Sequence, residues 1–150
     1  MPFKFNISEK SGKTFHFEGE AEGLEGKEIG QKISGQEINP DLAGYEFEIT
    51  GGTDLGGLPM LSQVDGFARA RVLLGYGKGM HGKSRKEGKK FRSNMSPPGM
   101  RRRKTVRGKV LSEAVSQVNL KVLKNGAKKL EEIYPDQCKP KEKKEAPAAA

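Results

Sequence analysis

The chain has 150 residues, of which only 33% are hydrophobic, and its net charge of +9 is unevenly distributed. The single cysteine, Cys138, excludes an internal disulfide, and no apolar run approaches the ~20 residues that a membrane span requires. We therefore expect a soluble cytoplasmic protein with one compact core, and neither a secreted nor a membrane protein.

The first half of the chain shows the alternation of apolar and polar residues that is typical of strands. Apolar side chains alternate with polar ones over residues 3–7 and again over residues 15–17, with a Ser-Gly turn between them, which predicts a β-hairpin. The clearest strand is expected at residues 45–49. Residues 50–60 contain four glycines and a proline, so we expect an irregular connection there.

The second half predicts further strands and one helix. Strands are expected at residues 68–74, at Val110 and Leu111, and over residues 118–122. Leu130, Ile133 and Tyr134 have helical spacing, which favours a short helix that ends before Pro135.

Together these elements predict a mainly β protein with a small β-barrel-like core, a long basic extension and a short C-terminal helix. The expected organisation places the first part of the β-rich core in residues 1–77 and a basic RNA-binding extension in residues 78–109. The remaining core strands and the helix follow in residues 110–134, and residues 135–150 form a disordered tail rich in Lys, Ala and Pro.

The basic segment, residues 78–109, dominates the charge of the chain. It holds 13 Lys or Arg and a single acid, Glu87, whereas residues 1–77 carry a net charge of −5. A block of one sign repels itself and requires a polyanion to become ordered, which makes nucleic acid the expected partner. Phe91 is suited to stacking on an unpaired base. Charge thus selects as RNA contacts Lys83, Arg85, Lys86, Lys89, Lys90, Arg92 and Lys109, and stacking adds Phe91.

A phosphate-loop pattern overlaps the basic segment. Residues 77–84, from Gly77 to Ser84, read GKGMHGKS and match G-x-x-x-x-G-K-[ST], in which Lys83 would contact phosphates and Ser84 a magnesium ion. That chemistry requires a helix directly after the loop. The following residues contain Gly88, lack an apolar stripe and run into two prolines, so we interpret the match as coincidental. A nucleotide-hydrolysing enzyme that uses this loop is the alternative.

No other set of residues predicts catalysis, a metal site, a cofactor or a small-molecule substrate. His16, His81 and Cys138 lack the paired spacing of metal ligands. Thr53 and Asp54 lie beside glycines, and turn formation is sufficient to explain them.

Several separated motifs resemble one family of proteins. They are ITGGTD at residues 49–54, GLPM at 57–60, the strand near 69–74, RRRKTVRG at 101–108 and VNL at 118–120. In this order, over residues 3–125, they resemble the S-six-e family of small-subunit ribosomal proteins, in its short archaeal-type form.

The resemblance implies a non-catalytic structural protein of the cytoplasmic ribosome, which binds small-subunit ribosomal RNA and contacts neighbouring ribosomal proteins. It also implies that RNA is contacted by Arg101, Arg102, Arg103, Lys104 and Arg107. An RNA-binding regulator that acts away from the ribosome is a second alternative.

Overall fold

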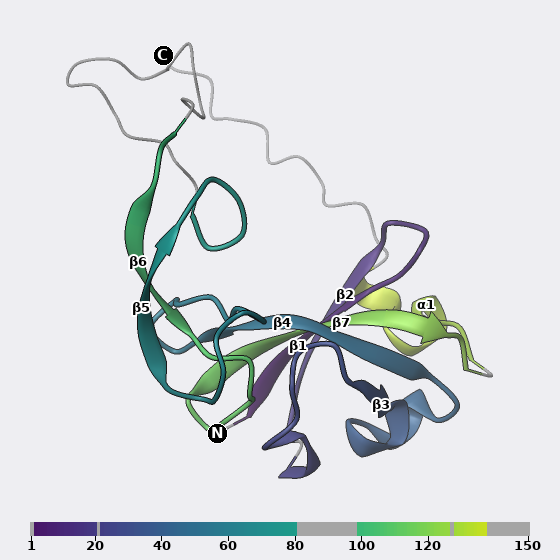
Figure 1. The fold of residues 1–150 in the computed structure, drawn as a ribbon. Coiled ribbons are helices and arrows are strands. Elements are labelled where there is room, and N and C mark those ends of the chain that lie inside the picture. Colours follow the sequence, from purple (N-terminus) through teal and green to yellow (C-terminus); the bar gives the residue numbers. More distant parts are fainter. Residues whose placement is uncertain (1, 21, 81–98, 127, 138–150) are drawn as a thin grey trace, which may run out of the picture.

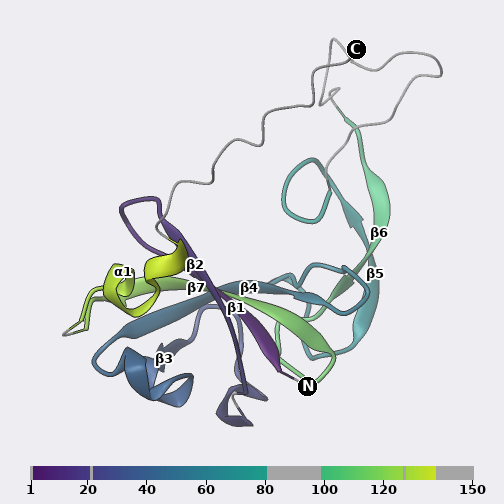
Figure 2. The same ribbon diagram turned by 180° about the vertical axis from the view of Figure 1, so that it is seen from behind.

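The part of the chain that the structure describes forms two sheets, one large and one small. The computed structural model describes residues 2–20, 22–80, 99–126 and 128–137. Figures 1 and 2 show from opposite sides that the smaller sheet is a two-stranded ribbon, which rises from one end of the larger sheet. The prediction of a mainly β protein is confirmed.

The larger sheet has five strands in the order β2-β1-β7-β4-β3. Only β1 and β7 run parallel; the other neighbours are antiparallel. Within the described residues β2 and β3 each pair on one side only, so the sheet is open and "barrel-like" describes it only loosely. The strands are β1 (Phe3–Ser8), β2 (Thr14–Gly19), β3 (Lys32–Ser34), β4 (Glu46–Asp54) and β7 (Val115–Lys124).

The ribbon, by which we mean the smaller sheet, pairs β5 (Arg69–Leu74) with β6 (Arg102–Arg107) in antiparallel register. Its register runs from Arg69 opposite Arg107, at the base, to Leu74 opposite Arg102. Six of the eight residues of the RRRKTVRG motif (101–108) therefore lie in a strand.

Helical elements are short. The prediction of a C-terminal helix is confirmed by α1 (Leu130–Ile133), and none of the described helices is long and apolar enough to cross a membrane. The 3₁₀ turns are η1 (Glu22–Leu24), η2 (Gly35–Glu37), η3 (Pro40–Leu42) and η4 (Pro135–Gln137).

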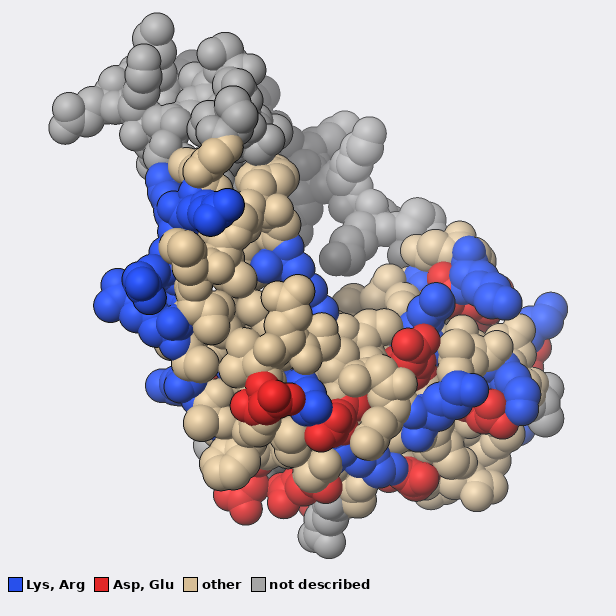
Figure 3. Space-filling model, viewed as in Figure 1, with Lys and Arg blue, Asp and Glu red and all other residues tan. Residues whose placement is uncertain are grey.

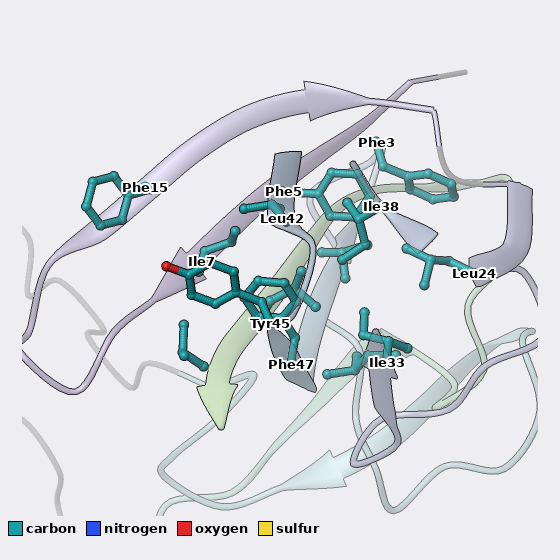
Figure 4. Close-up of a cluster of buried hydrophobic side chains, with 14 of the residues drawn as sticks. Phe3, Phe5, Ile7, Phe15, Leu24, Ile33, Ile38, Leu42, Tyr45 and Phe47 are labelled. Atoms are coloured by element: carbon teal, nitrogen blue, oxygen red, sulfur yellow. The ribbon is translucent and has the colours of Figure 1, made fainter. Parts of the chain in front are cut away.

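Alternating residues of the larger sheet build the core (Figure 4). Phe5 and Ile7 of β1 are fully buried, as are Phe47 and Ile49 of β4. The rings of Tyr45 and Phe47 stack with their centroids 5.6 Å apart. Burial of a side chain of this size contributes roughly 1.5–3 kcal/mol, so the core gives the ribbon a rigid base.

Two sequence expectations differ from the structure. Val110 and Leu111 form no strand; Val110 makes only an isolated bridge with Glu28. Strand β4 continues to Asp54 through residues that we expected to be irregular, although its register with β7 shifts between Ile49 and Gly51. The glycines permit close packing here, because a Cβ on Gly52 would lie 2.7 Å from the carbonyl oxygen of Gln117.

Candidate nucleic-acid interface

The ribbon carries exposed cations on both of its faces. Residues directly opposite one another share a face, which places Arg71 with Arg103 on one side and Arg102 with Lys104 on the other. Arg71, Arg103 and Lys104 are exposed and Arg102 is half-buried. In the space-filling view, Lys and Arg side chains gather along the ribbon, whereas acidic and basic side chains are intermingled over the larger sheet (Figure 3).

These cations have no counter-charge in the part of the chain that the structure describes. Arg71, Arg101, Arg102, Arg103 and Lys104 form no ion pair or side-chain hydrogen bond there. By contrast, two lysines of the larger sheet have acidic partners: Lys124 Nζ lies 2.6 Å from Glu46 Oε1, and Lys4 Nζ lies 3.4 Å from Glu18 Oε1. An array of uncompensated cations on a narrow ribbon produces a positive potential that attracts a polyanion.

A buried carboxylate anchors the base of the ribbon. The Asp54 side chain, at the end of β4, has no exposed surface. Its Oδ2 accepts hydrogen bonds from Arg107 Nη1 at 2.7 Å and from Arg69 Nε at 2.9 Å. Burial alone would raise the pKa of Asp54, but the hydrogen bonds from Arg107 and Arg69 outweigh it and hold the pKa below its ordinary value. One carboxylate thus ties both ribbon strands to the larger sheet.

Backbone contacts fix the same end of the ribbon. The amide of Arg107 donates to the Pro59 carbonyl at 3.0 Å, and the amide of Leu61 donates to the Arg107 carbonyl at 3.0 Å. Directly after the strand, a Cβ on Gly108 would lie 2.0 Å from the carbonyl oxygen of Gly66. Any side chain at position 108 would therefore push these two segments apart.

Two of the predicted RNA contacts have internal partners. The Arg107 side chain is only 9% exposed, and besides Asp54 it binds Ser112 Oγ at 3.2 Å. Its Nε and the Asp54 Oδ1 are buried without a hydrogen-bond partner. Lys109 Nζ lies 3.0 Å from Asp65 Oδ1 and 3.2 Å from Glu28 Oε2. The hydrogen bonds to these carboxylates, first that of Asp65, raise the pKa of Lys109 above its ordinary value.

The other predicted contacts divide into two groups. Arg102, Arg103 and Lys104 lie together on β6, and Arg101 directly precedes that strand. Outside the described residues are His81 and the predicted contacts Lys83, Arg85, Lys86, Lys89, Lys90, Phe91 and Arg92.

The described part of the phosphate-loop match does not have the geometry of a nucleotide site. The amides of Gly77 and Met80 donate to each other's carbonyl oxygens at 3.1 and 3.0 Å, and the Met80 side chain is fully buried. Among the described strands, the preceding strand β5 pairs with antiparallel β6 alone, whereas a phosphate loop follows a strand of a parallel sheet. Ser84 and Lys83 lie outside the described residues.

Sequence reasoning missed Asp54 and Arg71. The sequence around Asp54 indicates only a turn, because its partner Arg107 lies 53 positions away and nothing local indicates burial. The alternation of ARARVLL does place Arg69 and Arg71 on one face, which was the available signal for a basic strand. Within the described chain no group of His, Cys, Asp or Glu is arranged to hold a metal ion.

Comparison with known proteins shows which family the chain belongs to. The family described as Ribosomal protein S6e matches residues 3–135, which include both sheets. The chain belongs to this family. It is a family of ribosomal proteins and not of enzymes.

Archaeal relatives cover almost the whole chain. The small ribosomal subunit protein eS6 of Archaeoglobus fulgidus is 41% identical over 140 residues, which are 89% of this chain and 96% of the relative. The protein of the same name from Methanococcus maripaludis strain C6 is 39% identical over 127 residues, 84% of this chain and 90% of the relative. That of Methanosphaera stadtmanae is 36% identical over 145 residues, 97% and 91% of the two chains. The predicted family resemblance is confirmed.

Proposed function

We propose that this S6e-family protein is a structural constituent of the small ribosomal subunit in the cytoplasm, and that its ribbon binds ribosomal RNA. Support for the ribosomal part comes from the family match and from relatives that are named as small ribosomal subunit proteins. The observation that carries the RNA part is the set of cations on the ribbon that have no counter-charge among the described residues.

In this proposal the larger sheet is a rigid base and the ribbon presents cations to RNA phosphates. Arg71, Arg102 and Arg103 supply planar guanidinium groups, which suit bidentate contacts to phosphate oxygens. Because the ribbon is already folded and anchored at Asp54, binding orders little of its backbone, and little conformational entropy is lost there. Each phosphate that is neutralised releases counterions, so affinity must fall as salt rises.

The remaining predicted residues take different roles in the proposal. Arg101 and Lys104 contact phosphate beside the three arginines. Arg107 and Lys109 act mainly by holding the ribbon base, since both cations have internal partners. The proposal also includes Phe91, which would stack on a base, and six basic residues that are assigned by charge. These are Lys83, Arg85, Lys86, Lys89, Lys90 and Arg92.

Sedimentation of cell lysate tests the ribosomal assignment. A tagged full-length chain should co-migrate with small subunits in a sucrose gradient and remain there in moderate salt. A protein that migrates only with free RNA or in the soluble fraction would instead be the regulator that acts away from the ribosome, and the ribosomal assignment would be wrong.

The nucleotide-hydrolysing alternative is tested at Lys83. If residues 77–84 bind a nucleotide, the purified protein binds ATP with magnesium and Lys83→Ala abolishes that binding. Under our proposal neither protein binds ATP, and Lys83→Ala loses only a fraction of its RNA affinity, with a salt slope reduced by about 1.

A further inference from the structure

A groove of about 490 Å³ lies beside the base of the ribbon, on a surface that the RNA-binding proposal does not use. We call it the Phe67 groove. Its apolar lining is formed by Phe67, Val110, Leu111 and Ala114, and two acidic residues, Glu25 and Glu113, also line it. The groove therefore combines an apolar floor with carboxylates.

Backbone hydrogen bonds hold apolar residues exposed at and beside the groove. Phe67 is 62% exposed, yet the backbone on both sides of it is fixed: the Gly66 carbonyl accepts from the Val110 amide and the Ala68 carbonyl from the Gly108 amide, both at 3.1 Å. Leu55 is 60% exposed, and its amide donates to the carbonyl of the groove residue Ala114 at 3.2 Å. Large apolar residues that a fixed backbone holds exposed are typical of an interaction surface.

The floor of the groove is preformed as well. The amide of Gly26 donates to the Leu111 carbonyl at 3.0 Å, and the amide of Leu111 donates to the Lys27 carbonyl at 2.8 Å. The Leu111 side chain is itself only 1% exposed, so it seals the floor against the core. A partner would bind a shape that already exists, which lowers the entropic cost of binding.

The charges of the groove indicate the chemistry of its partner. Glu25 and Glu113 are exposed and form no ion pair within the described residues. Arg107, the cation that lines the groove, is neutralised by Asp54. The groove is therefore locally negative on a chain of net charge +9, and it repels RNA phosphates while it attracts cations.

From these observations we infer that the Phe67 groove binds a basic, extended segment of another polypeptide. Such a segment inserts an apolar side chain over Phe67 and Val110, and its flanking Lys or Arg side chains meet Glu25 and Glu113 at the rim. Because this inference rests on the proposed function, the segment belongs to a neighbouring protein of the small ribosomal subunit.

Photo-crosslinking inside assembled subunits tests this inference. The full-length chain carries p-benzoylphenylalanine at position 67, which keeps an aromatic group at the site, and small subunits are isolated before irradiation. We expect a crosslink to a protein whose crosslinked peptide contains Lys or Arg on both sides of the point of attachment. Glu25→Lys/Glu113→Lys should lower the crosslink yield by about five- to tenfold.

A matched variant, Asp41→Lys/Glu132→Lys, reverses two exposed carboxylates away from the groove and should leave the yield unchanged. A crosslink to ribosomal RNA, to a second copy of this chain or to a protein segment without basic residues would overturn the inference. So would a yield that is insensitive to Glu25→Lys/Glu113→Lys, or the lack of any crosslink in subunits that contain the protein. If the protein is missing from subunits, both this inference and the proposed function are wrong.

Discussion

Replacement of Asp54 by asparagine removes the charge that anchors the ribbon while preserving shape. The Arg107 side chain, only 9% exposed, then lacks a counter-charge. Breaking a buried pair in this way costs about 3–5 kcal/mol. Arg69 adds at most about 1 kcal/mol, because its side chain is 54% exposed and solvent screens the pair. An asparagine oxygen still accepts one hydrogen bond, so we expect a loss of about 3 kcal/mol in the free energy of unfolding.

Urea denaturation of the purified full-length chain measures this loss, and the thermal midpoint should fall by about 10 °C. Asp65→Asn is the matched control, since Asp65 also pairs with a cation, Lys109, but its side chain is 92% exposed. We expect Asp65→Asn to lower stability by no more than about 0.5 kcal/mol. Equal effects of the two substitutions, or a loss below about 1 kcal/mol for Asp54→Asn, would refute the assignment of Asp54 as the anchor.

Further predictions concern the same anchor. Gly108→Ala should lower the free energy of unfolding by about 1–3 kcal/mol, because the added Cβ would lie 2.0 Å from a backbone oxygen. The control Gly75→Ala, whose Cβ would have no atom within 4 Å, should change it by less than about 0.5 kcal/mol. Similar urea midpoints for the two variants would contradict this prediction. The pKa of Asp54 is lowered from 3.8, so its stabilisation is complete above that pH and is lost as the pH falls through the folded-state pKa. The stability difference between the wild-type chain and Asp54→Asn should therefore shrink as the pH falls below 3.8, and a constant difference would show that the carboxylate does not titrate as described.

The strands that alternate cleanly were predictable from the sequence. Phe3, Phe5 and Ile7 mark β1, and Val118, Leu120 and Val122 mark β7, because each strand buries one face against a common core. Strand β6 was harder to recognise, since four of its six residues are Arg or Lys and its pairing with β5 comes from residues far apart in the sequence.

The sequence predicts that the candidate site is basic, but it does not predict which of the cations have internal partners. The concentration of Arg and Lys after position 100 is visible in the sequence, and several of these residues lie together on the ribbon. The division of those cations into free and internally paired ones depends on Asp54, Glu28 and Asp65, which are distant in sequence. A long-range ion pair leaves no local pattern, so only the folded structure separates Arg107 from Arg103.

The most direct test of the account is the salt dependence of binding to small-subunit ribosomal RNA, measured by fluorescence anisotropy. The ribbon variant Arg71→Gln/Arg102→Gln/Arg103→Gln/Lys104→Gln is compared with Lys10→Gln/Lys121→Gln/Lys128→Gln/Lys129→Gln, which removes the same charge from exposed positions outside the ribbon.

The account predicts that the ribbon variant loses affinity and that its slope of log affinity against log salt falls by about 0.7–0.9 for each lost phosphate contact, up to about 3. The control should keep the slope of the wild-type chain within about 1. Equal losses in the two variants would show that total charge, and not the ribbon, binds the RNA, and would contradict the central claim.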